Sequence, residues 1–110
     1  MKTFDIKSMM PTTLVAETNL LRILRENKSE KMIKIIHGYG STGVGGTIKN
    51  MVHRTLKKKQ NSNEIKAFIP GEATVSLIGY DEIIRMYRSI LIKDSDFKKG
   101  NDGITYVILK

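Results

Sequence analysis

Hydrophobic residues alternate with polar ones at the start of the chain and then recur at helical spacing. Residues 2–7 place Phe4 and Ile6 on one side, which predicts a short, half-buried strand. Pro11-Thr12-Thr13 marks a turn and a helix N-cap, and the apolar stripe that follows predicts an amphipathic helix to about Asn27. Residues 31–36 are almost continuously apolar, so we expect a second strand near the centre of a sheet.

The same alternation of elements continues through the second half of the chain. Residues 47–59 predict a helix, because Ile48, Met51, Val52 and Leu56 recur at its period. Residues 64–69 predict a strand that ends at Pro70-Gly71, and 73–77 fit either a continuation of the sheet or a loop. Residues 81–91 predict a short helix. A polar loop at 93–103 then leads to a last strand at 104–109.

This order, β-α-β-α-β-(α)-β, predicts an α/β fold, and more closely a two-layer α/β sandwich with right-handed crossovers. The 110 residues suffice for one domain, so we expect 1–110 to form a single unit. The chain has no cysteine, which excludes disulfides, thiolate zinc sites and cysteine nucleophiles. It has no apolar run of the ~18 residues that span a bilayer and no stretch of signal-peptide type. We therefore expect a cytoplasmic protein with no membrane partner.

Positive charge dominates the composition. Lysine and arginine together number 19 against 11 acidic residues, which gives a formal charge of +8. In so small a domain this excess favours a polyanionic partner, and nucleic acid is the commonest one. The alternative is a soluble protein whose basic charge is incidental.

The densest glycine segment, residues 37–46, joins a predicted strand to a predicted helix. Such a turn presents backbone N–H groups at the positive end of the helix dipole, where phosphate binds well. This assigns a phosphate-binding role to Gly38, Tyr39, Gly40, Ser41, Thr42, Gly43 and Gly45. His37 stands beside them and could act as a general acid or base. The segment lacks the Gly-Lys-Ser/Thr of a Walker loop and the acidic partner of a dinucleotide site, and a merely flexible turn is the alternative.

A basic cluster follows on the predicted helix. It includes Lys49, His53, Arg54 and Lys57, with Lys58 and Lys59 at the end and no acid in the run. Because this helix begins at the glycine segment, a nucleic-acid backbone laid across it would meet amides first and cations next. A solvated helix face that ends in lysines is the alternative.

Aspartates form the third group of interest. Asp5 lies in the first strand, and Asp94, Asp96 and Asp102 lie in the late polar loop. Asp-x-Asp can hold a divalent cation, but no complete calcium-loop pattern follows. Turn-forming aspartates are the favoured explanation, so we predict no resident metal.

In its order of motifs the chain resembles the Smr (small MutS-related) domain family. Phe4-Asp5-Ile6-Lys7-Ser8-Met9 occupies the family's first motif, and His37-Gly38-Tyr39-Gly40 matches its second. Thr42-Gly43-Val44-Gly45 fits a threonine-glycine variant, and Gly103 to Leu109 fits the closing strand. The resemblance implies a fold like the C-terminal domain of translation initiation factor three. It also implies nucleic-acid binding and, in several members, endonuclease activity.

Family members occur free-standing or at the C-terminus of larger proteins, including the second MutS-like protein of bacteria. One position departs from the family, because Lys7 stands where members carry a histidine linked to cleavage. Lysine keeps a cation for phosphate but is a poor general base near neutral pH.

Three hypotheses follow from these residues. The first is a module that binds DNA or RNA through the glycine loop, the basic helix and Lys7, without a cofactor. The second is a structure-selective endonuclease that uses His37 and Asp5, with Mg²⁺ as its cofactor if it needs one. The third is a protein-interaction module. We rank binding first.

Overall fold

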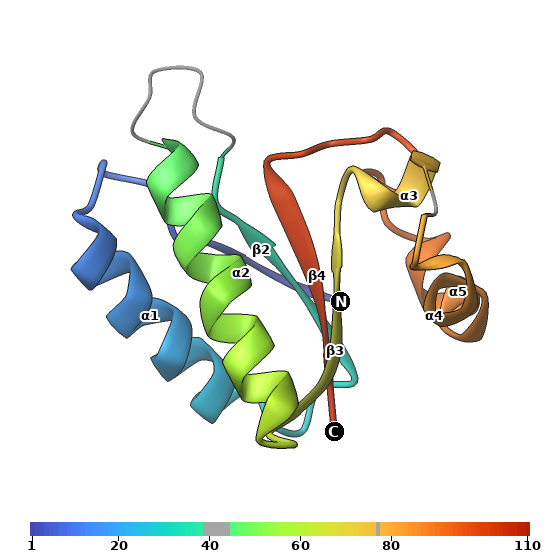
Figure 1. Ribbon diagram of the computed structural model, residues 1–110, viewed down its shortest axis with the longest axis horizontal. Helices are drawn as coiled ribbons and strands as arrows, with labels where there is room; N and C mark the ends of the chain where they lie inside the picture. The colour runs from blue at the N-terminus through green and yellow to red at the C-terminus, as the bar shows by residue number, and fades with distance from the viewer. Residues whose placement is uncertain (39–44, 77) are drawn as a thin grey trace.

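The computed structural model describes residues 1–38, 45–76 and 78–110 and shows a mixed sheet with helices on both faces (Figure 1). Tyr39, Gly40, Ser41, Thr42 and Gly43, which the sequence assigns to the phosphate loop, lie outside the described residues. The elements in chain order are β1 (Lys2–Asp5), α1 (Thr13–Glu26), β2 (Met32–Ile36), α2 (Gly45–Asn61), β3 (Ile65–Pro70), α3 (Ala73–Ser76), α4 (Asp81–Met86), α5 (Arg88–Leu91) and β4 (Ile104–Leu109).

The strands lie in the order β1-β2-β4-β3. β1 pairs with β2 in parallel, and β4 is antiparallel to both β2 and β3. The last strand therefore inserts between two strands that precede it. The two crossovers, through α1 and through α2, advance across the sheet in the same direction, so right-handed connections place both helices on one face. The predicted α/β sandwich and the central position of residues 31–36 are confirmed.

α1 and α2 lie side by side over this first face of the sheet (Figure 1). The Thr12 side chain caps α1 by accepting a hydrogen bond from Val15 N at 3.2 Å, as the sequence predicts. Apolar side chains of both helices and of the strands below them form one buried cluster. Its members are Ile6, Ala16, Leu20, Ile23, Leu24, Ile33, Ile35, Ile48, Met51, Val52, Leu56, Ile65, Val107 and Leu109.

The second face carries the short helices. Alternate residues of β4, among them Tyr106 and Ile108, point to this face and pack with Ile84, Tyr87 and Leu91. Residues 73–76, which the sequence left open between strand and loop, form the single turn α3. The one helix predicted over 81–91 is wrong in detail, because the backbone leaves helical geometry at Tyr87 (φ −113°, ψ 15°) and separates α4 from α5.

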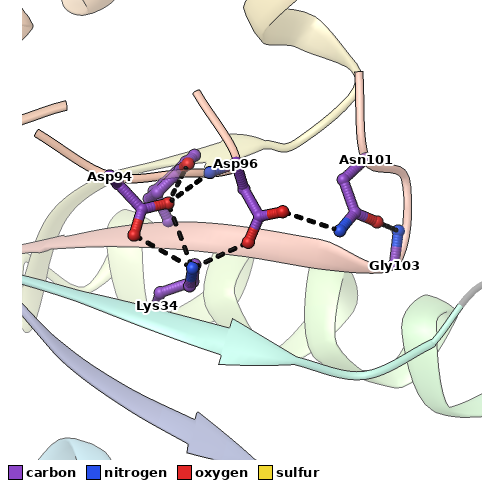
Figure 2. Close-up of polar contacts among 6 residues, drawn as sticks. Lys34, Asp94, Asp96, Asn101 and Gly103 are labelled. Atoms are coloured by element: carbon purple, nitrogen blue, oxygen red, sulfur yellow. Dashed lines mark hydrogen bonds and ion pairs between the residues drawn. The ribbon is translucent and has the colours of Figure 1, made fainter. Parts of the chain in front are cut away.

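A buried ion cluster ties the loop 93–103 to this second face (Figure 2). Lys34 comes from the middle of β2, and its side chain is only 7% exposed. Its Nζ donates to both carboxylate oxygens of Asp94 at 3.0 Å and to Asp96 Oδ2 at 2.7 Å. Asp94 and Asp96, which the sequence predicts as turn-forming residues, thus bind a cation, the ammonium group of Lys34.

Neighbouring side chains complete the cluster. The Tyr106 hydroxyl donates to Asp94 Oδ2 at 2.7 Å, and Asn101 Nδ2 donates to Asp96 Oδ1 at 3.1 Å. Burial opposes the charge on Lys34, but the hydrogen bonds to Asp96 and Asp94 outweigh it and raise the pKa of its amine. The carboxyl pKa of Asp94 is lowered, because hydrogen bonds from Tyr106 and Lys34 outweigh its burial.

We expect Lys34→Met to lower the free energy of unfolding by about 3–5 kcal/mol, because it leaves two partly buried carboxylates without their cation. Urea denaturation followed by circular dichroism measures the change. Lys57→Met, which removes the same group from an exposed site on α2, serves as the control and should change stability by less than about 0.5 kcal/mol. Similar decreases in the free energy of unfolding of the two variants would show that the ion cluster does not stabilise the fold.

Candidate nucleic-acid interface

The ends of β1, β2 and β3 meet the start of β4 at one edge of the sheet, which we call the carboxyl edge. Ile6 N donates to Ile36 O at 3.0 Å, so the chain beyond β1 still follows β2. His37 N and Gly38 N both donate to Gly103 O, at 2.9 and 3.0 Å. In α/β sheets the carboxyl ends of parallel strands are where ligands bind, and most of the predicted site residues that the structure describes lie here.

His37 is fully buried at this edge, with an exposed fraction of 0%. Its Nδ1 lies 2.6 Å from Gly38 O and its Nε2 lies 2.8 Å from Thr105 Oγ1. A carbonyl oxygen only accepts, so Nδ1 carries the proton and Nε2 accepts from the Thr105 hydroxyl. Burial lowers the pKa of His37 to about 4, and the hydrogen bond to Gly38 opposes that shift only in part.

His53 approaches the same hydroxyl from α2. Its Nε2 lies 2.9 Å from Thr105 Oγ1. Since the single hydroxyl proton of Thr105 is given to His37, the His53 Nε2–H must donate to that oxygen. The His53 ring also meets His37 edge-on, with centroids 5.7 Å apart, and stacks at a tilt on Phe68 at 5.6 Å. Burial, followed by the charge of Lys49, lowers the pKa of His53.

Lys49 is used inside the protein, although the sequence places it on the binding face. Its Nζ donates to Glu72 Oε2 at 2.7 Å and to the Asp102 carbonyl oxygen at 2.8 Å. Glu72 reaches this position because Gly71 lies against β4, where a Cβ would collide with the carbonyl oxygen of Asn101. Glu72 Oε1 is buried and has no hydrogen-bond partner among the described residues. The acid that neutralises Lys49 comes from the end of β3, 23 residues away, so the helix sequence alone does not reveal it.

Asp5 shapes the turn after β1. Its Oδ1 accepts from Lys7 N at 2.9 Å and from Ser8 N at 3.0 Å, and its Oδ2 lies 3.8 Å from Lys7 Nζ. The Lys7 side chain passes close to Gly38, where a Cβ would lie 3.2 Å from Lys7 Cδ. Gly38 also has a φ of +75°, which favours glycine. The structure therefore brings the predicted residues Lys7 and Gly38 together at the carboxyl edge.

The solvent side of α2 carries cations of a different kind. Arg54, Lys57 and Lys58 are exposed, and we call them the α2 cation face. Lys57 and Lys58 come three and four residues after Arg54, so all three lie on one side of the helix. No ion pair engages them within residues 1–38, 45–76 and 78–110. Two predicted residues, Arg54 and Lys57, thus lie where a phosphate could reach them, whereas Lys49 and His53 lie on the inner flank.

The start of α2 adds a further electrostatic feature. Gly45 begins this 17-residue helix, and its first turn contains no acidic side chain. The positive end of the helix dipole therefore points to the carboxyl edge without compensation by a side chain of that turn. In the described part of the chain no group of three or more histidines and carboxylates is placed to hold a metal ion.

Sequence reasoning missed two residues at this edge, Thr105 and Glu72. Thr105 is a polar residue inside an otherwise apolar strand, and it is fully buried. A polar residue in such a strand indicates a hydrogen-bonded site, because a buried hydroxyl needs partners. Lys34 carried the same signal in β2, where a lysine interrupts a strand that is buried on both faces.

We expect the domain to lose stability as the pH falls from 6.5 toward 4, because the unfolded His37 binds a proton at its ordinary pKa of 6.5 and the folded one only near 4. The stability from neutral His37 is complete above this window, and about 2 kcal/mol of it is lost by about pH 5. Urea titrations at about pH 7.5 and about pH 5 measure the loss.

His37→Gln should be less stable than the wild type at the higher pH, yet lose less on acidification. An unchanged loss in this variant would show that other groups cause the pH dependence. The pKa values of Asp94 and Asp96 are already lowered, so these carboxylates titrate below the window.

Comparisons of the chain with models of protein families, with curated proteins and with solved structures found no match. Among the described residues, no helix is long and apolar enough to cross a bilayer.

Proposed function

We propose that this chain is a nucleic-acid-binding domain of the Smr kind that holds the sugar–phosphate backbone on α2. The observation that carries the proposal is the α2 cation face. Arg54, Lys57 and Lys58 are exposed and unpaired in the part of the chain that the structure describes. Lysines elsewhere, such as Lys34 and Lys49, are held by acids inside the protein and contribute little to an external field.

The position of this face supports backbone contact. α2 rises about 1.5 Å per residue, so Lys58 lies about 20 Å along the axis from Gly45. A polyanion that follows the helix would meet the α2 cation face along its side and the positive helix end at the carboxyl edge. Lys7, with a side chain 49% exposed, adds one more cation at that edge. Contacts of this kind fix a backbone in place without reading its sequence.

The family assignment rests on the order of motifs. His37-Gly38 follows a central strand, a basic helix comes next, and Gly103 to Leu109 closes the sheet. The likeness to the C-terminal domain of translation initiation factor three and a cytoplasmic location belong to the same proposal.

Cleavage of the bound strand is the weaker alternative on this geometry. A general base must reach the proton that it removes. His37 is fully buried, and Gly38 and Thr105 engage both of its ring nitrogens. Asp5 is engaged by backbone amides through Oδ1. His37 is therefore not presented to a phosphate, and Asp5, although 40% exposed, is engaged in its own turn, so binding is the function that these contacts favour.

We expect Arg54→Ala/Lys57→Ala to weaken binding of duplex DNA and of structured RNA. The slope of log affinity against log salt on duplex DNA should fall by about 0.9 for each phosphate contact removed. Fluorescence anisotropy over a series of salt concentrations measures both effects. Lys93→Ala/Lys99→Ala removes the same charge from the loop after α5 and serves as the control. Equal weakening in both variants would show that net charge, not the α2 cation face, holds the nucleic acid.

We expect labelled duplex, branched DNA and structured RNA to be shifted but left intact by the wild type, with Mg²⁺ or with EDTA. Native and denaturing gels separate binding from cutting. Lys7→His restores the histidine of the family's first motif and tests whether cleavage depends on that position. Cleavage by the wild type that His37→Gln abolishes, while anisotropy still reports binding, would make this chain an endonuclease and overturn the binding-only proposal.

A further inference from the structure

A second basic surface lies at the other end of the molecule, where α1 and α2 end. Three adjoining hollows of about 250, 370 and 440 Å³ run across this end of the sheet. The first two share Lys28 and Glu64 in their walls, and the last two share Leu109 and Lys110. They therefore adjoin one another, and we call the three together the basal groove. It is lined by residues at the ends of the two long helices, by Leu109 at the end of β4 and by Tyr87 between α4 and α5.

Cations outnumber acids along the basal groove. Its walls contain six basic residues, namely Arg25, Lys28, Lys31, Lys59, Lys66 and Lys110. Among the described residues that line it, two have acidic side chains, Glu30 and Glu64. Glu64 is already held by Lys59 at 3.0 Å and by Ser62 Oγ at 2.6 Å. Among the described residues no ion pair holds the other five basic side chains of the groove, so these cations can meet an external anion.

Helix ends explain part of this charge and not the rest. Arg25 lies in the last turn of α1, where a cation suits the negative end of the helix dipole, and Lys59 lies in the last turn of α2. Lys31, Lys66 and Lys110 lie beside or within strands, where no helix end calls for them. A dipole effect therefore does not account for the row of cations across the whole groove.

The floor of the basal groove is aliphatic. Leu24, Ile65 and Leu109 reach its surface with exposed fractions of 6%, 3% and 5%. Leu21 is half-buried beside them. A ligand that fills the groove must therefore offer apolar side chains to the floor and negative groups to the walls.

These two requirements separate the basal groove from the α2 cation face. Single-stranded nucleic acid needs aromatic rings on which its bases can stack. Tyr87, the one aromatic residue among the described residues that line the groove, is 7% exposed, and Lys66 Nζ lies 5.8 Å from the centre of its ring. That ring face is occupied. Aliphatic residues between acidic ones, as in a peptide, match both floor and walls.

We propose that the basal groove binds an acidic peptide segment of a partner protein, with glutamates or aspartates on the lysine walls and leucine-like side chains on the floor. This surface lies at the opposite end of the sheet from Gly38 and does not depend on the proposed function. The domain would then hold nucleic acid at one place and a protein partner at another.

The test uses a labelled synthetic peptide in which glutamate alternates with leucine. In one reference peptide serine replaces leucine, and in another lysine replaces glutamate. Fluorescence anisotropy gives the affinity, and ¹H–¹⁵N NMR spectra locate the contact. We expect the glutamate–leucine peptide to bind most tightly and to shift the amides of Leu21, Leu24, Ile65 and Leu109.

Charge reversal then separates the two surfaces. Lys28→Glu/Lys31→Glu should weaken the peptide about tenfold or more, since like charges would face each other across the contact. The matched reversal Arg54→Glu/Lys57→Glu should leave peptide affinity unchanged and weaken nucleic acid. All four positions are exposed, and circular dichroism checks that each variant folds.

Three results would overturn the proposal. The first is no binding of the glutamate–leucine peptide at NMR concentrations. The second is equal binding of the glutamate–serine peptide, which would mean that the floor contributes nothing. The third is displacement of the peptide by an oligonucleotide that shifts the same amides, which would make the groove a nucleic-acid site.

Discussion

A single hydroxyl group sets the arrangement of the carboxyl edge. Thr105 has one proton to give, and two imidazoles lie within hydrogen-bond distance of its oxygen. Because His37 Nδ1 is committed to a carbonyl, the direction of every bond in the series is fixed, from His53 through Thr105 and His37 to Gly38. The series joins the end of β2, the start of β4 and the inner flank of α2. The outer flank of that helix is therefore held at a fixed orientation to the sheet.

β4 provides a hydrogen-bonding side chain to each face of the sheet. Thr105 points to the α1–α2 face, and Tyr106, the next residue, points to the other face and donates to Asp94. All six residues of this strand are buried. In the middle of an apolar sheet, each polar group must be matched by a partner from a distant segment, and a matched group specifies which segments meet.

The sequence predicted the helices and strands well, but it did not predict which charged side chains form ion pairs inside the protein. Apolar periodicity located the four strands and both long helices, because burial of one face imposes that periodicity directly. The fate of a charge depends on segments that are far away in the chain. Lys49 was expected on the binding face because no acid is near it in the sequence, yet the fold brings Glu72 to it. The break at Tyr87 had no signal at all, since neither glycine nor proline stands there.

The insertion of β4 between β2 and β3 also has a consequence for the order of events during synthesis. Met32 pairs with Ile108, and Ile65 pairs with Leu109. Neither β2 nor β3 can therefore pair with β4 until residues 104–109 have been synthesised. Until residues 104–109 leave the ribosome, β2 and β3 each have an apolar edge with unpaired backbone groups. Such edges invite pairing with other chains. The nascent chain therefore exposes two such edges until the sheet closes, and non-local pairing of this kind is a slow step of folding.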